Sequence, residues 1–261
     1  MAKVTPTTPI KASTAVAKAR VNLPVDVNAA MAAEVAAMQN RISAPSGDRI
    51  TASQSKKFKL PNGLQVDTLE CVIVDFSAGN MYYDSDFDRD NIVPPKCFAL
   101  GLEPAILVPS DNSPDKQAES CSTCWANQFK SKGKGKACSN GRFLALLPLD
   151  ADAETQLQIL KVSSTAIRGF DALVGSVARS YNMPVRGVVT EISFDPNQEY
   201  ATMVFRAIGP APKDLVMLAQ SMKDEAITRL LVEPDVSAAT VVAAPASKKA
   251  PSKKAAVAGR R

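Results

Sequence analysis

The sequence predicts an α+β domain over residues 55–232, built on an antiparallel β-barrel or strongly curved sheet with two main helices. Three observations predict it. Residues 186–208 alternate apolar and polar side chains on both sides of the turn "DPNQ", which is typical of a β-hairpin. The run from Val66 to Phe76 is rich in β-branched residues, as strands are. Residues 164–181 and 214–231 place apolar side chains at helical spacing.

Shorter elements complete the predicted domain. Pro61, Asn62 and Gly63 indicate a turn before the first long strand, and "SAGN" (77–80) indicates a second turn at its end. Four further segments are predicted as strands: "CFALG" (97–101), "PAILVPS" (104–110), "RFLALLPL" (142–149) and "TQLQILKVS" (155–163).

The two flanks differ from the domain in composition. Residues 1–25 consist largely of Thr, Pro, Ala, Val and Lys without periodicity, which predicts a disordered N-terminal segment. Residues 26–44 predict an alanine-rich helix with Asp26 or Asn28 as its cap. Residues 238–261 predict a disordered basic tail.

Charge is unevenly distributed along the chain. The net charge is +5, but residues 1–20 carry four basic residues and residues 241–261 carry six, with no acidic residue in either segment. The rest of the chain holds 21 basic and 26 acidic residues and is therefore net acidic. The charge of a binding surface must be assessed locally.

Composition also bears on compartment and activity. No run of 18 uncharged apolar residues indicates a membrane span, and the first 20 residues lack the apolar core of a secretory signal. We expect a soluble protein in a reducing compartment, where clustered cysteines bind metal more often than they form disulfides. The chain has no histidine, so the usual general base is absent, and we expect a protein that is not an enzyme.

Two motifs that suggest catalysis or calcium binding do not fit their patterns. "KGKGKAC" has Ala and Cys where a phosphate-binding P-loop has Ser or Thr followed by a helix. The acidic cluster Asp84, Asp86, Asp88 and Asp90 lacks the glycine and glutamate of a calcium loop, and we interpret it as a solvated loop.

The segment "CSTCWANQFKSKGKGKAC" (121–138) gathers three of the five cysteines, the single tryptophan and four lysines. A long loop without periodic hydrophobicity needs a constraint inside a compact domain. The Cys-x-x-Cys pair Cys121 and Cys124, with Cys97 before it and Cys138 after it, supplies four soft donors suited to tetrahedral Zn²⁺. The predicted metal loop spans residues 97–142.

Alternatives to zinc stay open at this point. An iron–sulfur cluster also takes four cysteines, and the four could instead be free thiols. Four thiolates close the coordination sphere, so the predicted site is structural. Cys71 lies in the apolar run "LECVIV" and is expected to be a buried core residue.

The same loop combines stacking faces with positive charge. Aromatic rings stack on unpaired bases and lysines neutralise phosphates without regard to sequence. The candidate DNA-binding residues are Trp125, Phe129, Tyr82, Tyr83, Lys130, Lys132, Lys134, Lys136 and Arg142. The competing interpretations are that Trp125 packs in a small core against the metal knuckle and that the lysines form a solvated turn.

"PPKCFAL", "NSPDKQAESCSTCWANQFKSKGKGKACSNGRFLALL", "LKVSSTAIRGFDALV" and "PVRGVVTEISFDPNQEYATMVFR" resemble a family of bacteriophage single-stranded DNA-binding proteins, over residues 58–210. The resemblance implies an antiparallel OB-like β-barrel with an inserted cysteine-rich metal-binding loop. It implies zinc ligation by Cys97, Cys121, Cys124 and Cys138, and a role in phage DNA replication or recombination in the cytoplasm of the infected bacterial host. Many single-strand binders end in an acidic tail that recruits replication proteins. This chain ends in lysines and arginines, which puts such recruitment in doubt.

The predicted function is therefore sequence-independent binding of single-stranded DNA. The alternative is a virion structural or assembly protein that uses the metal-stapled loop as an interaction platform. A nuclease or recombinase ranks last.

Overall fold

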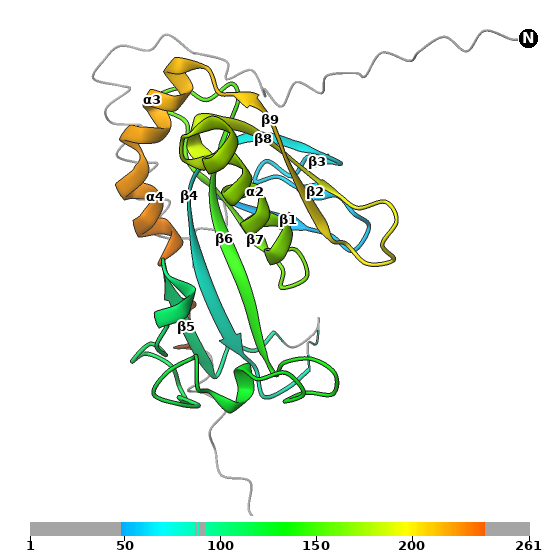
Figure 1. Cartoon of the computed structure of the whole chain (residues 1–261). Helices are drawn as coiled ribbons and strands as arrows, with labels where there is room; N and C mark the ends of the chain where they lie inside the picture. Colours follow the sequence, from blue (N-terminus) through cyan, green and yellow to red (C-terminus); the bar gives the residue numbers. More distant parts are fainter. Residues whose placement is uncertain (1–47, 87, 89–91, 238–261) are drawn as a thin grey trace, which may run out of the picture.

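The computed structural model describes residues 48–86, 88 and 92–237. The predicted N-terminal segment, the alanine-rich helix and the basic tail lie outside these residues. The described chain is α+β. One mixed sheet curls into a half-barrel, and three α-helices pack on it (Figure 1).

The sheet contains nine strands, eight of them in the order β3-β2-β1-β7-β6-β4-β8-β9, while β5 pairs with the far end of β4. The strands are β1 (Arg49–Ala52), β2 (Phe58–Lys59), β3 (Gln65–Val66), β4 (Leu69–Tyr82), β5 (Cys97–Gly101), β6 (Cys138–Pro148), β7 (Gln158–Val162), β8 (Val188–Phe194) and β9 (Met203–Pro210). The helices are α2 (Ile167–Tyr181), α3 (Lys213–Ser221) and α4 (Lys223–Leu230).

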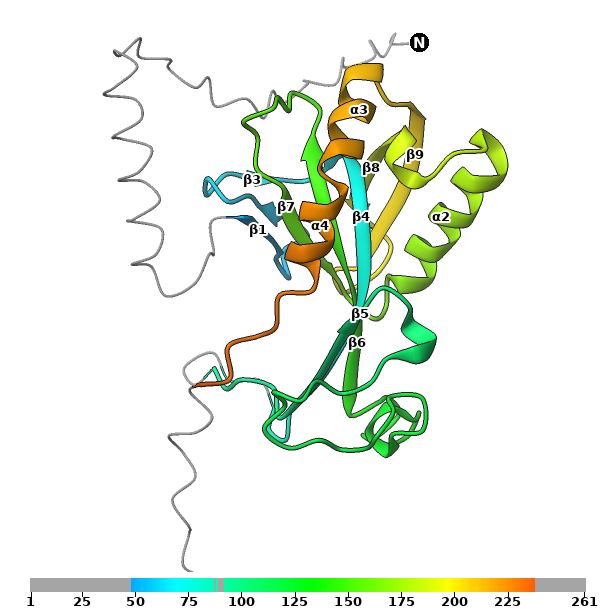
Figure 2. The ribbon, with the colours of Figure 1, turned by 90° about the vertical axis from the view of Figure 1, so that its left-hand side faces the viewer.

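Apolar side chains cover both faces of the sheet. On one face α2 buries Phe170, Leu173 and Val177 against a cluster that includes Ile73 and Leu144. On the other face α3 and α4 cover a second cluster, which includes Val72, Val74, Phe143, Leu147 and Leu157. Alternate residues of a strand point to opposite faces, so β4 and β6 contribute to both clusters. Figure 2 shows α4 on one side of β4 and α2 on the other.

Side chains join two separated parts of the curled sheet. The ring of Phe58 on β2 stacks on that of Phe194 on β8, with centroids 4.4 Å apart. The Lys56 ammonium donates hydrogen bonds to the backbone oxygens of Asp195, Pro196 and Gln198 at 3.1, 3.3 and 2.7 Å. The β1–β2 turn is thereby tied to the β8–β9 turn.

Several expectations about the fold are confirmed. The hairpin predicted over 186–208 is β8–β9, and 164–181 contains α2. The long strand predicted at 66–76 is β4, which pairs with β6 and β8. The segment predicted at 155–163 is β7, which pairs with β6.

Other expectations are wrong. The sheet is not wholly antiparallel, because β1 pairs with β7 in parallel, with Arg49 opposite Ile159. β1 also lies before residue 55. The helix predicted over 214–231 is two helices that meet at Met222, and residues 104–106 form a 3-10 helix instead of a strand.

The predicted turn "SAGN" is wrong because residues 77–80 lie inside β4. Gly79 serves close packing there. A Cβ on Gly79 would stand 2.4 Å from a ring carbon of Phe143 and 2.9 Å from a methyl of Leu100. The glycine therefore lets both side chains cross the strand, and β4 continues beyond the helix-covered part of the sheet.

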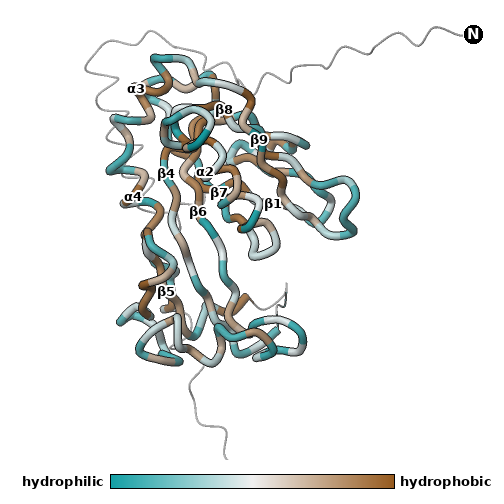
Figure 3. Tube along the Cα trace, viewed as in Figure 1, coloured by the Kyte–Doolittle hydropathy of each residue, from teal (hydrophilic) through white to brown (hydrophobic). Residues whose placement is uncertain are grey.

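The far ends of β4 and β6, with β5 and the loop that joins β5 to β6, form a separate region that we call the cysteine lobe (residues 78–82 and 96–141). It extends below the rest of the sheet, which we call the body (Figure 1). Hydrophilic residues recur through its loops, as the colouring of Figure 3 shows. Within the described residues, no helix has the length and apolar character needed to cross a membrane.

Candidate metal centre and nucleic-acid interface

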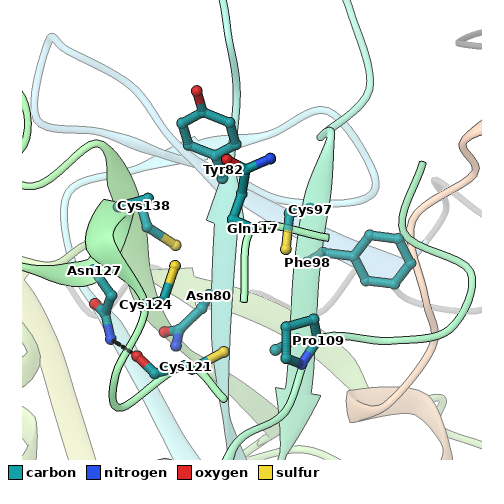
Figure 4. Close-up of a pocket in the computed structure, with 12 residues that line it drawn as sticks. Asn80, Tyr82, Cys97, Phe98, Pro109, Gln117, Cys121, Cys124, Asn127 and Cys138 are labelled. Atoms are coloured by element: carbon teal, nitrogen blue, oxygen red, sulfur yellow. Dashed lines mark hydrogen bonds between the residues drawn. The ribbon is translucent and has the colours of Figure 1, made fainter. Parts of the chain in front are cut away.

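The fold brings the four predicted cysteine ligands together in the lobe. Tyr82, the last residue of β4, is opposite Cys97 on β5 and opposite Cys138 on β6. Residues opposite one another in a sheet point to the same face, so the two thiols flank one position. Cys121 and Cys124 come from the loop between these strands. Figure 4 shows the four sulfur atoms directed towards a shared space.

That space is a small cavity. Its volume is about 10 Å³, and all four cysteines line it, together with residues that include Asn80, Tyr82, Gln117 and Asn127. Each cysteine is buried, with 6–8% of its surface exposed. A cavity of this size has room for about one water-sized occupant. The cavity therefore suits a single ion better than an organic ligand.

Side chains that follow the Cys-x-x-Cys pair hold its turn in place. Asn127 Nδ2 donates to the Cys121 carbonyl at 2.7 Å, and Gln128 Nε2 donates to the Cys124 carbonyl at 3.3 Å. The Cys121 amide donates to the Leu107 carbonyl at 3.0 Å. The short sequence "CSTCWANQ" thus carries both the thiols and the amides that orient their backbone. These hydrogen bonds hold the pair to its own loop and to Leu107, which follows the 3-10 helix at 104–106.

A row of amide side chains links the loop to β4 and β6. Asn140 Nδ2 donates to Asn80 Oδ1 and, at 3.0 Å, to Asn127 Oδ1, which also accepts from Lys136 Nζ at 3.1 Å. Asn80 also hydrogen-bonds the Cys121 thiol, which opposes the rise in its pKa. Sequence reasoning missed Asn80 and Asn127 as residues of the site. Asn80 interrupts an apolar strand, and that interruption is the signal that could have indicated it.

Burial and the neighbouring thiols raise the pKa of two of the cysteines, Cys138 and Cys121. Desolvation, followed by the charges of Cys121, Cys124 and Cys97, raises the pKa of Cys138 to about 12. Desolvation and the charges of Cys97 and Cys124 also raise the pKa of Cys121. Several thiolates cannot share the cavity without a cation, since like charges at short range disfavour ionisation. A bound metal ion would reverse this balance.

The donor set fits a metal ion in its chemistry. Four soft sulfur donors suit Zn²⁺ or an iron–sulfur cluster by their chemistry, and the size of the cavity favours the single ion. All five cysteines are free thiols, including Cys71, which is buried in the body as predicted. In the part of the chain that the structure describes, no group of three or more Cys, Asp or Glu side chains could hold a metal ion in its present arrangement. The ligand set stays a prediction.

The predicted aromatic residues do not share one environment. Trp125 is 50% exposed, packs edge-on against Tyr82 with centroids 5.7 Å apart, and donates from Nε1 to Gln117 Oε1 at 3.2 Å. Phe129 is 76% exposed. Tyr83 is half-buried beside Met81, and desolvation raises its pKa. Trp125 thus combines both interpretations, since one part of it packs in the lobe and another faces solvent.

One of the loop lysines, Lys136, lies over Phe129. Lys136 Nζ lies 5.0 Å from the centre of its ring, and Lys130 and Lys134 are exposed nearby in the sequence. Lys132 is exposed but pairs with Asp86 at 2.6 Å. The Asp86 pKa is lowered by this hydrogen bond and by the lysine charge. The charge of Lys132, a predicted DNA contact, is therefore partly neutralised, and so is the charge of Asp86 in the acidic cluster.

Arg142 lies in a different setting from the lysines. It lies on β6, and its guanidinium pairs with Asp171 on α2 at 3.1 Å. Its side chain is 12% exposed. The structure therefore places it at the junction between the lobe and α2, where an internal partner occupies its charge.

Comparisons with protein-family models, with curated proteins and with solved structures return no match to the chain.

Proposed function

We propose that the protein binds single-stranded DNA without regard to sequence and without turnover, through the cysteine lobe. The observation that carries the proposal is that the lobe has thiols in its interior and aromatic and basic side chains on its surface. Four buried thiols share one cavity, and the loop around it presents Trp125, Phe129 and the lysines to solvent. Aromatic faces and lysines together are the elements of non-specific single-strand binding.

In this proposal Cys97, Cys121, Cys124 and Cys138 hold one Zn²⁺, with an iron–sulfur cluster as the alternative. The metal would fix the loop, because few of the large apolar side chains of the lobe are buried. The loop is the cysteine-rich insertion of an OB-like domain, and the curled sheet is compatible with that description. The context proposed for the protein is phage DNA replication or recombination, with other phage proteins of those processes as partners.

Stacking on Trp125 and Phe129 can be tested with the full-length protein. We expect it to bind a single-stranded oligonucleotide more tightly than a duplex of equal length, with quenching of Trp125 fluorescence. The Phe129→Ala and Trp125→Ala variants should each lose about 1–3 kcal/mol of binding free energy. Fluorescence anisotropy with a labelled oligonucleotide measures the affinities.

A control tests whether the aromatic rings of the lobe, and not any exposed aromatic ring, contribute to binding. Tyr200→Ala removes an aromatic ring that is 57% exposed in the β8–β9 connection, outside the lobe. It should bind single strands as the wild type does. Equal binding of duplex and single strand, or no effect of either lobe substitution, would contradict the proposal.

The metal has its own test. Elemental analysis of protein purified without added metal should give about one zinc per chain. Iron with visible absorbance would indicate a cluster instead. Cys124→Ser should abolish metal binding, and Cys71→Ser, in the body, should leave it unchanged. Absence of any metal in the wild-type protein would end the metal proposal.

One observation favours the alternative, a virion or assembly protein. The segment that follows β5 exposes Leu102, Ile106 and Val108, with exposed fractions of 45, 70 and 59%. Clustered exposed apolar residues mark protein interfaces more often than nucleic-acid surfaces. High copy number in purified particles, together with loss of assembly in Ile106→Ser, would support this alternative.

A further inference from the structure

A second cationic site lies where the body meets the lobe, on the sheet face that α4 partly covers. Arg49 on β1 is opposite Ile159 on the parallel strand β7. Lys161 follows two residues after Ile159 and so points to the same face of the sheet. The parallel pairing therefore brings Arg49 and Lys161 to one place. This pairing was not predicted from the sequence.

The Lys161 side chain lies over β6. Its Cε is 3.5 Å from the position that a Cβ on Gly141 would occupy, and its Nζ lies 5.9 Å from the centre of the Phe143 ring. Phe143 also lines a cavity of about 50 Å³ next to Arg49. The other residues that line this cavity are Met81, Leu100, Ile159, Arg229, Leu230, Val232 and Pro234. Arg49 and Arg229 thus border an apolar recess, and Lys161 lies near Phe143, which also lines it.

The charges at this recess are not balanced. Arg229 is paired, with Glu225 at 2.9 Å and Asp48 at 3.6 Å. Among the described residues, neither Arg49 nor Lys161 forms an ion pair. Desolvation, followed by the charge of Arg49, lowers the pKa of Lys161. Two neighbouring cations without an internal anion repel each other and favour an external one.

We propose that Arg49 and Lys161 form a phosphate-binding site, and that the apolar recess receives part of the group attached to the phosphate. Arginine offers a planar fork of donors and lysine a point charge, and phosphate oxygens accept from both. The phosphate belongs either to the backbone of a nucleic-acid strand or to a free phosphate compound. The first source rests on the proposed function, as a second contact for the strand held by the lobe. The second source does not.

The test uses the full-length protein and inorganic phosphate as the probe. Phosphate should shift the backbone amide signals of residues 49–50 and 159–161 saturably, against chloride at equal ionic strength. Lys161→Met keeps the alkyl stem over Gly141 and removes the charge. It should weaken phosphate binding about tenfold, the loss of one charge-assisted hydrogen bond. Arg49→Met gives an independent reading.

Lys213→Met is the matched control, since Lys213 is an exposed lysine on α3 that makes no ion pair among the described residues. It should bind phosphate as the wild type does, and Lys161→Arg should retain binding. A wild-type protein without saturable phosphate shifts, or a Lys161→Met variant with unchanged affinity, would overturn the proposal.

A second titration, with oligothymidine at several salt concentrations, identifies the source of the phosphate. If the site contacts a strand, Lys161→Met should reduce the salt slope of binding by about 0.7, the value for one phosphate of a single strand. An unchanged slope with lost phosphate binding assigns the site to a free phosphate compound. If the wild type binds no single strand at all, the lobe proposal fails, and the phosphate shifts still decide this one.

Discussion

The body and the cysteine lobe are built on the same two strands but are held together differently. In the body, β4 and β6 lie between two apolar clusters that contain fully buried rings and branched side chains such as Phe170, Leu144 and Val72. In the lobe, the buried clusters consist of three alanines, Leu107 and three of the four cysteines, and Phe98 on β5 is buried as well. Removal of apolar surface from water stabilises folds in proportion to area. The body can thus stand on its own core, whereas the lobe buries less apolar surface and relies more on hydrogen bonds, and on a metal ion if its thiols bind one as we propose.

The largest expected difference comes from one substitution made in each region. Phe170→Ala removes a fully buried ring that packs against Phe76 and Phe205, and should lower the free energy of unfolding by about 3–5 kcal/mol. Phe129→Ala in the lobe removes an exposed ring and should change it by less than about 0.5 kcal/mol. Urea denaturation followed by far-ultraviolet circular dichroism measures both. Similar losses in the two variants would show that the lobe contributes a core of its own.

Loss of one cysteine should separate the two regions. Cys124→Ser should leave the lobe open to protease within residues 121–137, because the loop would then lose the metal ion that we propose its cysteines share. The free energy of unfolding of the body should change by less than about 0.5 kcal/mol. Limited proteolysis with mass spectrometry locates the cuts, and urea denaturation reports on the body. Equal resistance to protease in variant and wild type would contradict a metal-held lobe.

The body and the lobe each contain a thiol with a pKa raised to about 12, Cys71 in the body and Cys138 in the lobe. Burial alone raises the pKa of Cys71 in the body, whereas the other cysteines add to the effect at Cys138 in the lobe. Only the second effect reverses when a cation binds. A buried thiol with a raised pKa favours the folded state fully below its unfolded value of 9.0, and this contribution is lost as pH rises towards 12.

Wild-type protein should therefore lose up to about 1.4 kcal/mol of stability per pH unit between pH 9 and 12 from Cys71 alone. Cys71→Ala should remove that part of the slope, as urea denaturation at a series of alkaline pH values would show. An identical slope in the variant would mean that Cys71 is not desolvated in the folded protein.

The smallest expected effect lies where the two regions meet. Glu233, which follows α4, accepts hydrogen bonds from the Ser110 hydroxyl and from Asn112 Nδ2, the latter at 2.6 Å. Because these groups are largely exposed, Glu233→Ala should cost about 0.5 kcal/mol. Hydrogen exchange should rise in residues 110–113 and stay unchanged in α2. Faster exchange throughout the body would contradict a local role.

The sequence predicts those features whose pattern lies within one segment of the chain. Periodicity within one segment located α2, the β8–β9 hairpin and the long strands, and the spacing of cysteines located residues that do share one cavity. Contacts between segments far apart in the chain leave no pattern in the sequence of either segment. The parallel pairing of β1 with β7 and the ion pair of Arg142 with Asp171 depend on register across the fold, and neither could be predicted. "SAGN" misled because Gly79 serves packing inside a strand, although glycine and asparagine commonly mark turns.

The hydrogen bonds of Glu233 have a mechanical consequence. If β4 and β6 alone connected the lobe to the body, the connection would be a two-stranded ribbon, free to twist about its long axis. The segment after α4 runs beside the lobe and attaches it at a third point (Figure 2). An attachment outside the ribbon opposes this twist. If the loop binds single-stranded DNA as we propose, tension on that strand would act on the segment after α4 as well as on β4 and β6, and would so reach the body by two routes.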